Sequence, residues 1–473
     1  MSMASWQSGT AISRRNMLAR AAGGFGAIAL AGMLAEESAR AASTDPMAPR
    51  EGHFPARAKN VIFFFSTGGT SHVDTFDYKP QLFAGHGKSV TANEWLGKPG
   101  KFERFLKKSN WEFRPYGESG TRVSDLFPHL GKVIDDVCII NSLHGDHPGH
   151  DKATMGMHTG SFNVARPSIG SWVSYGLGTE NRNLPSFLVL APAAPYAGAQ
   201  TWGSDFLPAC HQGTHVIPGP VPLPNLKPLS PSSDLQQMEL ALLKSINQSH
   251  QKDRRDDALE ARIRSFETAF GMQKDAPEAF DLSKETRETH ELYGVAPGAT
   301  SGFGWQCLVA RRMVERGVRF IEVIDSGSQS AQNWDSHGDM NAHAPLAKMV
   351  DQPMAALIAD LKRRGMLDST LIVWTTEFGR TPFNTSADHK GREHHQYVFS
   401  SWLAGGGVKG GLVWGSSDEF GMMPAENPVH VHDFHATILH LLGIDHERLT
   451  YRYAGRDYRL TDVAGEVVRG ILA

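Results

Sequence analysis

Histidines and carboxylates gather in a few short segments of this 473-residue sequence. Residues 144–151 hold three imidazoles and two carboxylates, among them His150, and Asp335 and His337 stand two positions apart. In an extended loop such a pair points to one side and can share a metal ion. Histidine also transfers protons near neutral pH. The segments therefore predict a divalent-metal or acid–base site, and turn, capping and solvated-loop roles remain the alternative for each of them.

Two further segments carry side chains that suit a site. Glu377 directly follows a strand-like run, where a metal ligand or general base would sit. Arg380, three positions later, suits bidentate binding of an anionic substrate group, although it can also pair with Glu377. His394 and His395 lie on the next loop, where a ligand role fits them.

Continuous β-branched and aromatic runs predict the strands that position these residues. The runs are residues 60–66, 137–141, 187–190, 318–324, 371–376 and 398–403. Helical patterns lie between them, at residues 234–270, 304–315, 345–364 and 432–442. This alternation predicts an α/β fold with a central, mostly parallel sheet flanked by helices in one large domain. Parallel sheets form their ligand crevice beyond the carboxyl ends of the strands, so we expect the polar segments to converge there.

Composition excludes several classes of protein. With 47 basic and 50 acidic residues the formal net charge is −3, so no net positive field favours nucleic acid. The three cysteines, Cys138, Cys210 and Cys307, are too scattered for a disulfide framework or a zinc ribbon. The phosphate-binding loop signature fails because its opening glycine is replaced by Leu82, and there is neither an H-E-x-x-H helix nor a C/S-x-P-x-R sulfatase maturation motif.

The amino-terminal segment is typical of a twin-arginine export signal. Arg14 and Arg15 precede the apolar run 21–34, and Ala39-Arg40-Ala41 has the small-x-small pattern of a cleavage site. An ordinary amphipathic helix is the alternative. We expect residues 1–41 to be a signal peptide, 42–56 a linker and 57–473 the α/β domain of a periplasmic or extracellular protein. No other segment reaches the roughly 18 apolar residues of a membrane span, so we expect none in the mature chain.

Six motifs resemble a known bacterial family. They are residues 68–77 (GGTSHVDTFD), 166–178 (RPSIGSWVSYGLG), 334–337 (WDSH), 377–382 (EFGRTP), 405–411 (GGGVKGG) and 435–443 (HATILHLLG). Together they resemble the family catalogued as domain of unknown function 1501, a branch of the alkaline phosphatase and sulfatase superfamily, over almost all of the mature chain. The resemblance implies an alkaline phosphatase-like fold, two divalent metals at the strand ends, a nucleophile on the helix after the second strand, and hydrolysis of phosphate or sulfate esters.

The chain departs from that superfamily pattern at two places. Thr67 stands where the superfamily has a metal-binding aspartate, and the nearest carboxylates are Asp74 and Asp77. Residues 150–153 (HDKA) offer no serine, threonine or cysteine as nucleophile. An altered metal site, a water nucleophile with His150 as base, and loss of catalysis are all compatible with these residues.

The combined expectation is a metal-dependent hydrolase acting on a small or polymeric anionic ester. Its divalent ion, of open identity, would be held by Asp74, Asp335, His337, Glu377 and His394. His150 would act as base, and Arg380 would face the substrate anion. The alternative is a non-catalytic binding or scaffold protein that retains the fold. The sequence leaves the oligomeric state open.

Overall fold

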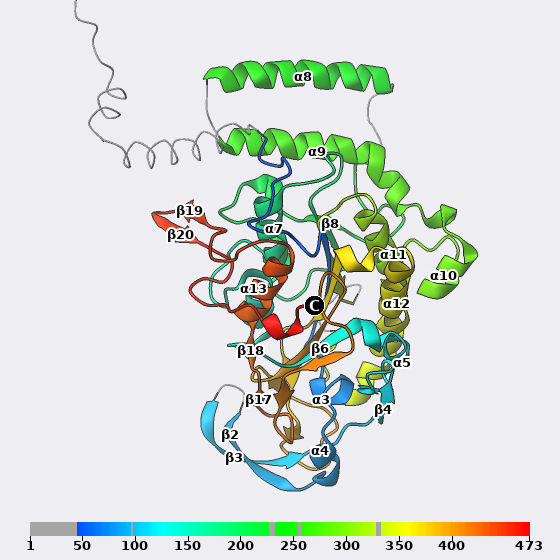
Figure 1. The fold of residues 1–473 in the computed structure, drawn as a ribbon, viewed down its shortest axis with the longest axis vertical. Coiled ribbons are helices and arrows are strands. Elements are labelled where there is room, and N and C mark those ends of the chain that lie inside the picture. The colour runs from blue at the N-terminus through cyan, green and yellow to red at the C-terminus, as the bar shows by residue number, and fades with distance from the viewer. Residues whose placement is uncertain (1–44, 96–97, 227–231, 254–256, 328–332) are drawn as a thin grey trace, which may run out of the picture. The chain divides into compact units, whose positions relative to one another are not determined.

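The computed structural model describes residues 45–95, 98–226, 232–253, 257–327 and 333–473. Residues 47–473 form one compact unit (Figure 1). The expected signal peptide, residues 1–41, lies outside the described residues. Residues 47–56, expected as part of a linker, belong to this unit and are hydrogen-bonded to its other segments: the Arg50 N–H donates to the Leu177 carbonyl (3.0 Å) and the His53 N–H to the Gly443 carbonyl (2.8 Å).

A nine-stranded sheet forms the centre of the unit, with the strand order β15-β6-β14-β10-β1-β9-β7-β8 and β18 beside β6. The strands are β1 (Asn60–Ser66), β6 (Val137–His144), β7 (Phe187–Leu190), β8 (Thr214–Val216), β9 (Phe320–Asp325), β10 (Thr370–Thr375), β14 (Phe399–Ala404), β15 (Leu412–Trp414) and β18 (Val429–His430). Every pairing is parallel except those of β14, which runs antiparallel to β10 and β6. The predicted α/β class and mostly parallel sheet are confirmed.

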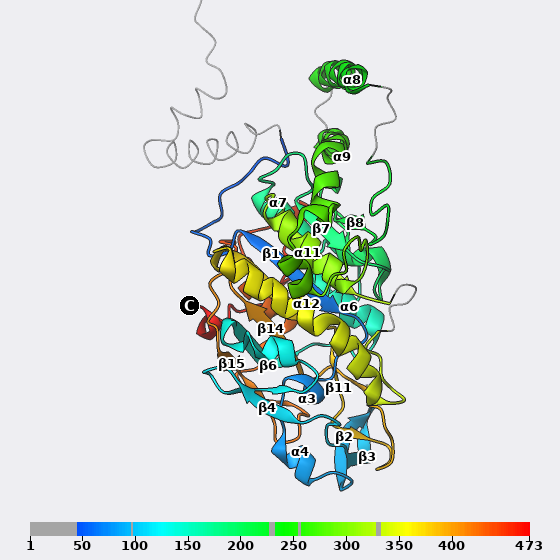
Figure 2. The ribbon, with the colours of Figure 1, turned by 90° about the vertical axis from the view of Figure 1, so that its right-hand side faces the viewer.

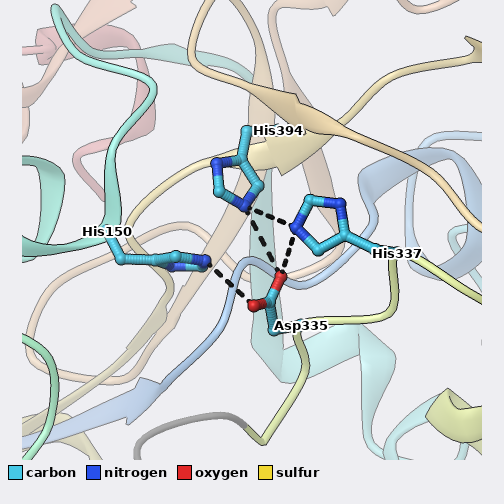
Figure 3. Close-up of side chains that lie close together, drawn as sticks. All are labelled: His150, Asp335, His337 and His394. Carbon is cyan, nitrogen blue, oxygen red and sulfur yellow. Dashed lines mark hydrogen bonds and ion pairs between the residues drawn. The ribbon is translucent and has the colours of Figure 1, made fainter. Parts of the chain in front are cut away.

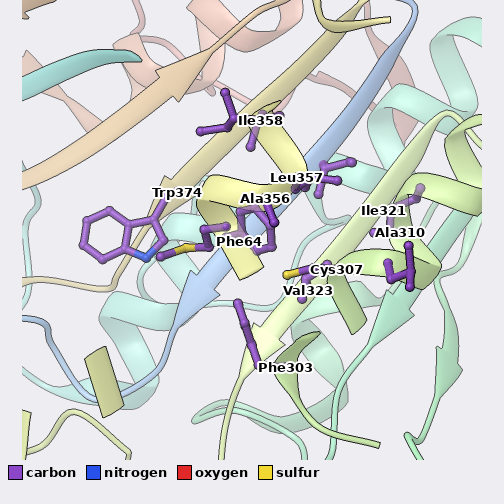
Figure 4. Close-up of a cluster of buried hydrophobic side chains, with 14 of the residues drawn as sticks. Phe64, Phe303, Cys307, Ala310, Ile321, Val323, Ala356, Leu357, Ile358 and Trp374 are labelled. Carbon is purple, nitrogen blue, oxygen red and sulfur yellow. The ribbon is translucent and has the colours of Figure 1, made fainter. Parts of the chain in front are cut away.

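The central strand β1 is buried on both faces, because it pairs with β10 on one side and β9 on the other and helices cover both faces. Successive side chains of a strand alternate between faces. Phe63 and Phe65 therefore join a core cluster with Trp172 and Phe434, whereas Phe64 joins the opposite cluster (Figure 4). A near-continuous apolar run is typical of strands covered on both faces.

Helices cover both faces of the sheet. One face packs against α11 (Phe303–Val314) and α12 (His343–Arg363), and in Figure 2 α12 lies across the face turned to the viewer. The other packs against α6 (His150–Thr159), α7 (Ile169–Leu177) and α13 (Val431–Leu441). The expected helix 234–270 corresponds to two helices, α8 (Ser233–Asp253) and α9 (Asp257–Phe280). Among the described residues, no helix is long and apolar enough to cross a membrane.

Short elements decorate this framework. The helices are α3 (His72–Thr75), α4 (Pro80–Ala84), α5 (Pro128–Gly131) and α10 (Arg287–Tyr293); the strands are β2 (Ser89–Trp95), β3 (Lys98–Leu106), β4 (Phe113–Tyr116), β5 (Thr121–Ser124), β11 (Gly379–Arg380), β12 (Phe383–Asn384), β13 (His394–His395), β16 (Ser416–Ser417), β17 (Pro424–Glu426), β19 (Tyr451–Tyr453) and β20 (Arg456–Tyr458). All of these short strands lie in two- or three-stranded sheets outside the central one.

The strand directions explain which polar segments meet. The segments after β1, β6, β9 and β10 leave at the carboxyl edge of parallel strands, where such sheets bind ligands. Because β14 is antiparallel to β10, its first residue lies at that same edge, and β13 with His394 immediately precedes it. The antiparallel strand β14 therefore places His394, which precedes its amino end, at the edge where the parallel strands have their carboxyl ends.

Candidate metal centre

His150, Asp335, His337 and His394 converge at this edge (Figure 3). One ligand atom from each residue can be chosen so that all four atoms lie within 4.8 Å of one another. His150 is the first residue of α6, Asp335 and His337 lie between β9 and α12, and His394 begins β13. The structure therefore brings together three of the five expected metal ligands and adds His150, which was expected as a base.

Asp335 is the common partner of the three imidazoles. Its Oδ1 lies 2.9 Å from His337 Nε2 and 3.5 Å from His394 Nε2, and its Oδ2 lies 3.3 Å from His150 Nε2. His337 Nε2 and His394 Nε2 are themselves only 2.9 Å apart. Two imidazole lone pairs at that distance repel each other unless a proton or a cation lies between them.

The opposite nitrogen of each ring binds an oxygen. Nδ1 lies 2.7 Å from Glu377 Oε1 in His150, 2.7 Å from Glu393 Oε2 in His337 and 2.7 Å from the Pro148 carbonyl in His394. A carbonyl cannot donate a hydrogen bond and an ionised carboxylate only accepts one, so each Nδ1 carries the proton. Each Nε2 is then left to coordinate, which is how metal-binding histidines are commonly held.

The electrostatics of the cluster favour a bound cation or proton. Burial opposes ionisation of Asp335, but the three imidazoles and Arg380 outweigh burial and lower the pKa of this carboxyl. Hydrogen bonds to Asp335 and Glu393 raise the pKa of His337 to about 9. Burial lowers the pKa of His394, whereas in His150 the carboxylates of Asp335 and Glu377 outweigh burial and raise it. A proton on His337 and a metal ion would thus compete for the same nitrogen.

His150 provides the clearest test of whether a metal fits. Its Nε2 is buried and, although it lies 3.3 Å from Asp335 Oδ2, it makes no hydrogen bond of acceptable geometry. A buried nitrogen without a hydrogen bond costs free energy, which coordination would recover. Tetrahedral zinc ligands lie about 3.3 Å apart, close to the spacings around Asp335. The residues present therefore fit a metal ion.

Glu377, an expected ligand, lies one layer behind the four residues. Its Oε1 accepts hydrogen bonds from His150 Nδ1 (2.7 Å) and from the Gly68 N–H (2.8 Å), and its Oε2 accepts one from the Thr376 hydroxyl (3.0 Å). The side chain is buried. These contacts use both oxygens, so Glu377 orients His150 and is not itself one of the four clustered residues.

Arg380, expected to face a substrate anion, is fully buried beside Asp335. Its Nη2 lies 2.5 Å from Asp335 Oδ1 and also donates to the Gly68 carbonyl. Its Nε donates to the Gly69 carbonyl (2.9 Å), and its Nη1 to the Arg392 carbonyl (3.2 Å). The guanidinium therefore holds Asp335 and the loop after β1 rather than an open substrate space.

Asp74, the remaining expected ligand, lies outside the cluster. Its Oδ2 accepts hydrogen bonds from Arg392 Nε (2.6 Å) and from the Ser71 hydroxyl (2.5 Å), and both members of the ion pair are fully buried. The pair ties α3 to the loop that leads to His394.

The other histidines of the segment 144–151, His144 and His147, are not part of the four-residue cluster. His144 packs its ring against His430, and His147 Nδ1 accepts a hydrogen bond from the Gly149 N–H.

Three residues of the site are not predicted from the sequence. Glu393 stands next to His394 in a charged segment and could have been found by looking for carboxylates that orient histidines. Pro148 contributes only a carbonyl, which no residue type reveals. Tyr196 comes from the loop after β7; its ring stacks on His150 with centroids 4.0 Å apart and planes 11° apart, and its hydroxyl lies 3.5 Å from Asp335 Oδ2. The only sequence signal for Tyr196 is its position after a strand of the parallel sheet.

Comparison with solved structures finds distant likenesses. The chain shares 13% identity with the sulfatase PsFucS1 from Pseudoalteromonas sp., with coverage of 83% of this chain and 69% of that one and a TM-score of 0.33. The phosphonate monoester hydrolase SpPMH from Silicibacter pomeroyi is 12% identical, with coverage of 88% of this chain and 76% of that one and a TM-score of 0.36. A Mg-bound variant of TAB5 alkaline phosphatase is 10% identical, with coverage of 74% of this chain and 92% of that one and a TM-score of 0.30.

No curated protein sequence matches this chain significantly. One family model, described as a protein of unknown function (DUF1501), matches residues 58–472. That range includes all four residues of the cluster and the whole central sheet. The chain belongs to the DUF1501 family.

Proposed function

We propose that this protein is an exported, metal-dependent hydrolase of phosphate or sulfate esters. The observation that carries the proposal is the arrangement of His150, His337 and His394, whose Nε2 atoms turn toward Asp335 while their Nδ1 atoms are held by oxygens. The ester class rests on the resemblance of the sequence motifs to the alkaline phosphatase and sulfatase superfamily.

The donor set favours zinc or another first-row transition ion. Three imidazole nitrogens and one carboxylate suit such ions, whereas Mg²⁺ and Ca²⁺ prefer oxygen ligands. A bound ion of this kind polarises an ester oxygen and lowers the pKa of a coordinated water. In this proposal His150 is a ligand, with Glu377 holding its Nδ1, and Arg380 fixes Asp335.

The first turn of α6 supports water as the nucleophile. This turn holds His150, Asp151, Lys152 and Ala153, and Thr154, the next residue, is fully buried. The absence of Ser, Thr and Cys from residues 150–153 also favours a second candidate, a metal-binding protein without catalysis. Hydrolysis through a covalent intermediate would need a nucleophilic side chain at this position.

Metal analysis of protein purified from the exported fraction tests the proposal. We expect about one transition-metal ion per chain, removed by a strong chelator. Protein without stoichiometric metal would contradict both candidates. A panel of aryl phosphate, phosphodiester, phosphonate and sulfate esters then separates them: metal-dependent turnover supports the hydrolase, and inactivity of metal-replete protein toward the whole panel supports the binding protein.

Export is a separate part of the proposal and rests on Arg14, Arg15 and the apolar run after them. Replacing both arginines by lysine should leave the precursor in the cytoplasm, measured by fractionation and immunoblotting. Equal export of the variant and the parent would refute a twin-arginine route without bearing on the metal centre.

A further inference from the structure

We infer that Tyr196 is a positioning residue of the metal centre, whose ring sets the tilt of the His150 imidazole and hence the direction of its Nε2. The inference rests on the proposed metal-dependent function. The two rings are stacked almost parallel, with centroids 4.0 Å and planes 11° apart. Within the described part of the chain, no other ring contact of the four cluster residues is as close and as parallel; the next closest, between His150 and His394, is edge-on at 4.3 Å and 75°.

His150 needs such a contact because its nitrogens alone do not fix the ring. Nδ1 has one strong bond, to Glu377 Oε1 at 2.7 Å, and Nε2 has no hydrogen bond. A ring held through one nitrogen can still change its χ1 and χ2 dihedral angles slightly, which tilts the ring and moves Nε2 relative to Asp335. Tyr196 covers one face of the imidazole at 4.0 Å, and Phe378 lies 4.9 Å away at a tilt of 41°.

The loop that carries Tyr196 is itself tied to the site. The Ser326 hydroxyl, after β9, donates to the Ala193 carbonyl (2.9 Å) and accepts from the Ala193 N–H (3.2 Å). The Ala197 N–H, just after Tyr196, donates to Asp151 Oδ1 (3.4 Å), next to His150. The tyrosine is therefore anchored on the strand that leads to Asp335 and on the helix that begins with His150.

The ring rather than the hydroxyl is the important part. The hydroxyl reaches Asp335 Oδ2 only at 3.5 Å, the outer limit of a hydrogen bond. The stacking contact is close and parallel, as offset aromatic pairs prefer. Phenylalanine should therefore replace Tyr196 with little loss, whereas a side chain without a flat ring should not.

The experiment compares wild type, Tyr196→Phe and Tyr196→Ala. Zn²⁺ affinity is measured by competition with a chromophoric chelator, and coordination geometry by the visible spectrum of the Co²⁺-loaded protein. We expect Tyr196→Ala to bind Zn²⁺ about 10-fold or more weakly, as happens when residues that orient metal ligands are removed, with an altered Co²⁺ spectrum. Tyr196→Phe should restore both the affinity and the spectrum.

Controls keep the test decisive. Tyr453→Ala removes a half-exposed tyrosine on the β19–β20 hairpin, which supplies no ligand, and should change neither readout. If Tyr196→Ala does not fold, Tyr196→Leu keeps the bulk without the flat face and should show the same altered spectrum. Wild-type affinity in Tyr196→Ala, or equal losses in the Phe and Ala variants, would overturn the role of the ring. Wild-type protein that binds no Zn²⁺ would instead contradict the proposed function.

Discussion

Asp335 links the parts of the site at the level of single residues, because three imidazoles and one guanidinium face its two oxygens. Its pKa is lowered, since the imidazoles outweigh the burial that opposes ionisation. An amide at this position would keep the shape but lose the charge that both the imidazoles and a metal ion require.

We predict that Asp335→Asn abolishes stoichiometric metal binding and leaves the fold intact. Metal content by mass spectrometry and far-UV circular dichroism measure the two effects. Asp339→Asn is the matched control. Asp339 lies four positions after Asp335, caps the short 3-10 helix Met340–Ala342 by accepting a hydrogen bond from the Asn341 N–H, and is not one of the clustered residues. Full metal occupancy in Asp335→Asn would remove this residue from the site.

The affinity for the ion should depend on pH through His337. Its pKa is raised to about 9 by hydrogen bonds to Asp335 and Glu393, so below that pH a metal must displace a proton from the imidazole. The apparent Kd for Zn²⁺ should then fall by about tenfold for each pH unit between pH 7 and pH 9. Chelator competition at several pH values measures this slope, and an affinity independent of pH would argue against His337 as ligand.

Buried ion pairs between elements position the residues of the candidate metal centre, and the pair of Asp74 with Arg392 is the main example. The pair joins α3 to the segment before β13, and Arg392 also donates to the Lys107 and Thr381 carbonyls (both 3.1 Å). Glycine is needed at the neighbouring position 391, since a Cβ there would lie 1.6 Å from the His337 carbonyl oxygen. The segments that carry His337 and His394 thus pack backbone to backbone.

Asp74→Asn should lower the free energy of unfolding by about 3 kcal/mol, because it leaves the buried Arg392 without its counterion. Metal content of the folded variant should stay at the wild-type level. Urea denaturation and metal analysis give the two readouts. The control is Asp457→Asn, whose partner Arg452 is exposed, with an expected change within about 0.5 kcal/mol. Loss of metal without loss of stability would restore Asp74 as a ligand.

The elements explain why the sequence predicted part of the site. The apolar runs around Phe63 and Ile372 are long and β-branched or aromatic, so they identify parallel strands, and parallel strands identify the edge where Asp335 and Glu377 lie. The sequence shows which residues come after a strand, but it does not show how deeply they are buried. Glu377 and Arg380 both reach the edge, and only packing decides that they hold ligands. Pairing of Asp74 with Arg392 joins residues 318 positions apart, which no local pattern contains.

The molecule as a whole holds several histidines neutral in its interior. Burial lowers the pKa of His72, His211, His343 and His435 to about 3 in each case. In the unfolded chain these imidazoles have a pKa near 6.5, so between about pH 6.5 and pH 3 the unfolded state binds more protons. The free energy of unfolding therefore falls as pH falls through this interval.

Each of these histidines should cost about 2 kcal/mol of stability at pH 5 relative to pH 7. Asp325 works in the opposite direction, since burial raises its pKa to about 6 and the folded state binds its proton first. We expect the histidines to dominate, so that urea midpoints fall steeply from pH 7 to pH 5. His435→Gln should reduce the slope, and an unchanged midpoint between the two pH values would contradict the prediction.

The distance along the chain between the four cluster residues has a mechanical consequence. More than a third of the chain separates His150 from Asp335, and 57 positions separate His337 from His394. An ion bound to all four would cross-link three distant segments and close large loops, as a set of disulfides would. Saturating metal at 100 times its Kd should add about 2.7 kcal/mol to the free energy of unfolding, and a chelator should lower the melting temperature by a few degrees in wild type but not in Asp335→Asn. Calorimetry with and without chelator would measure this cross-link.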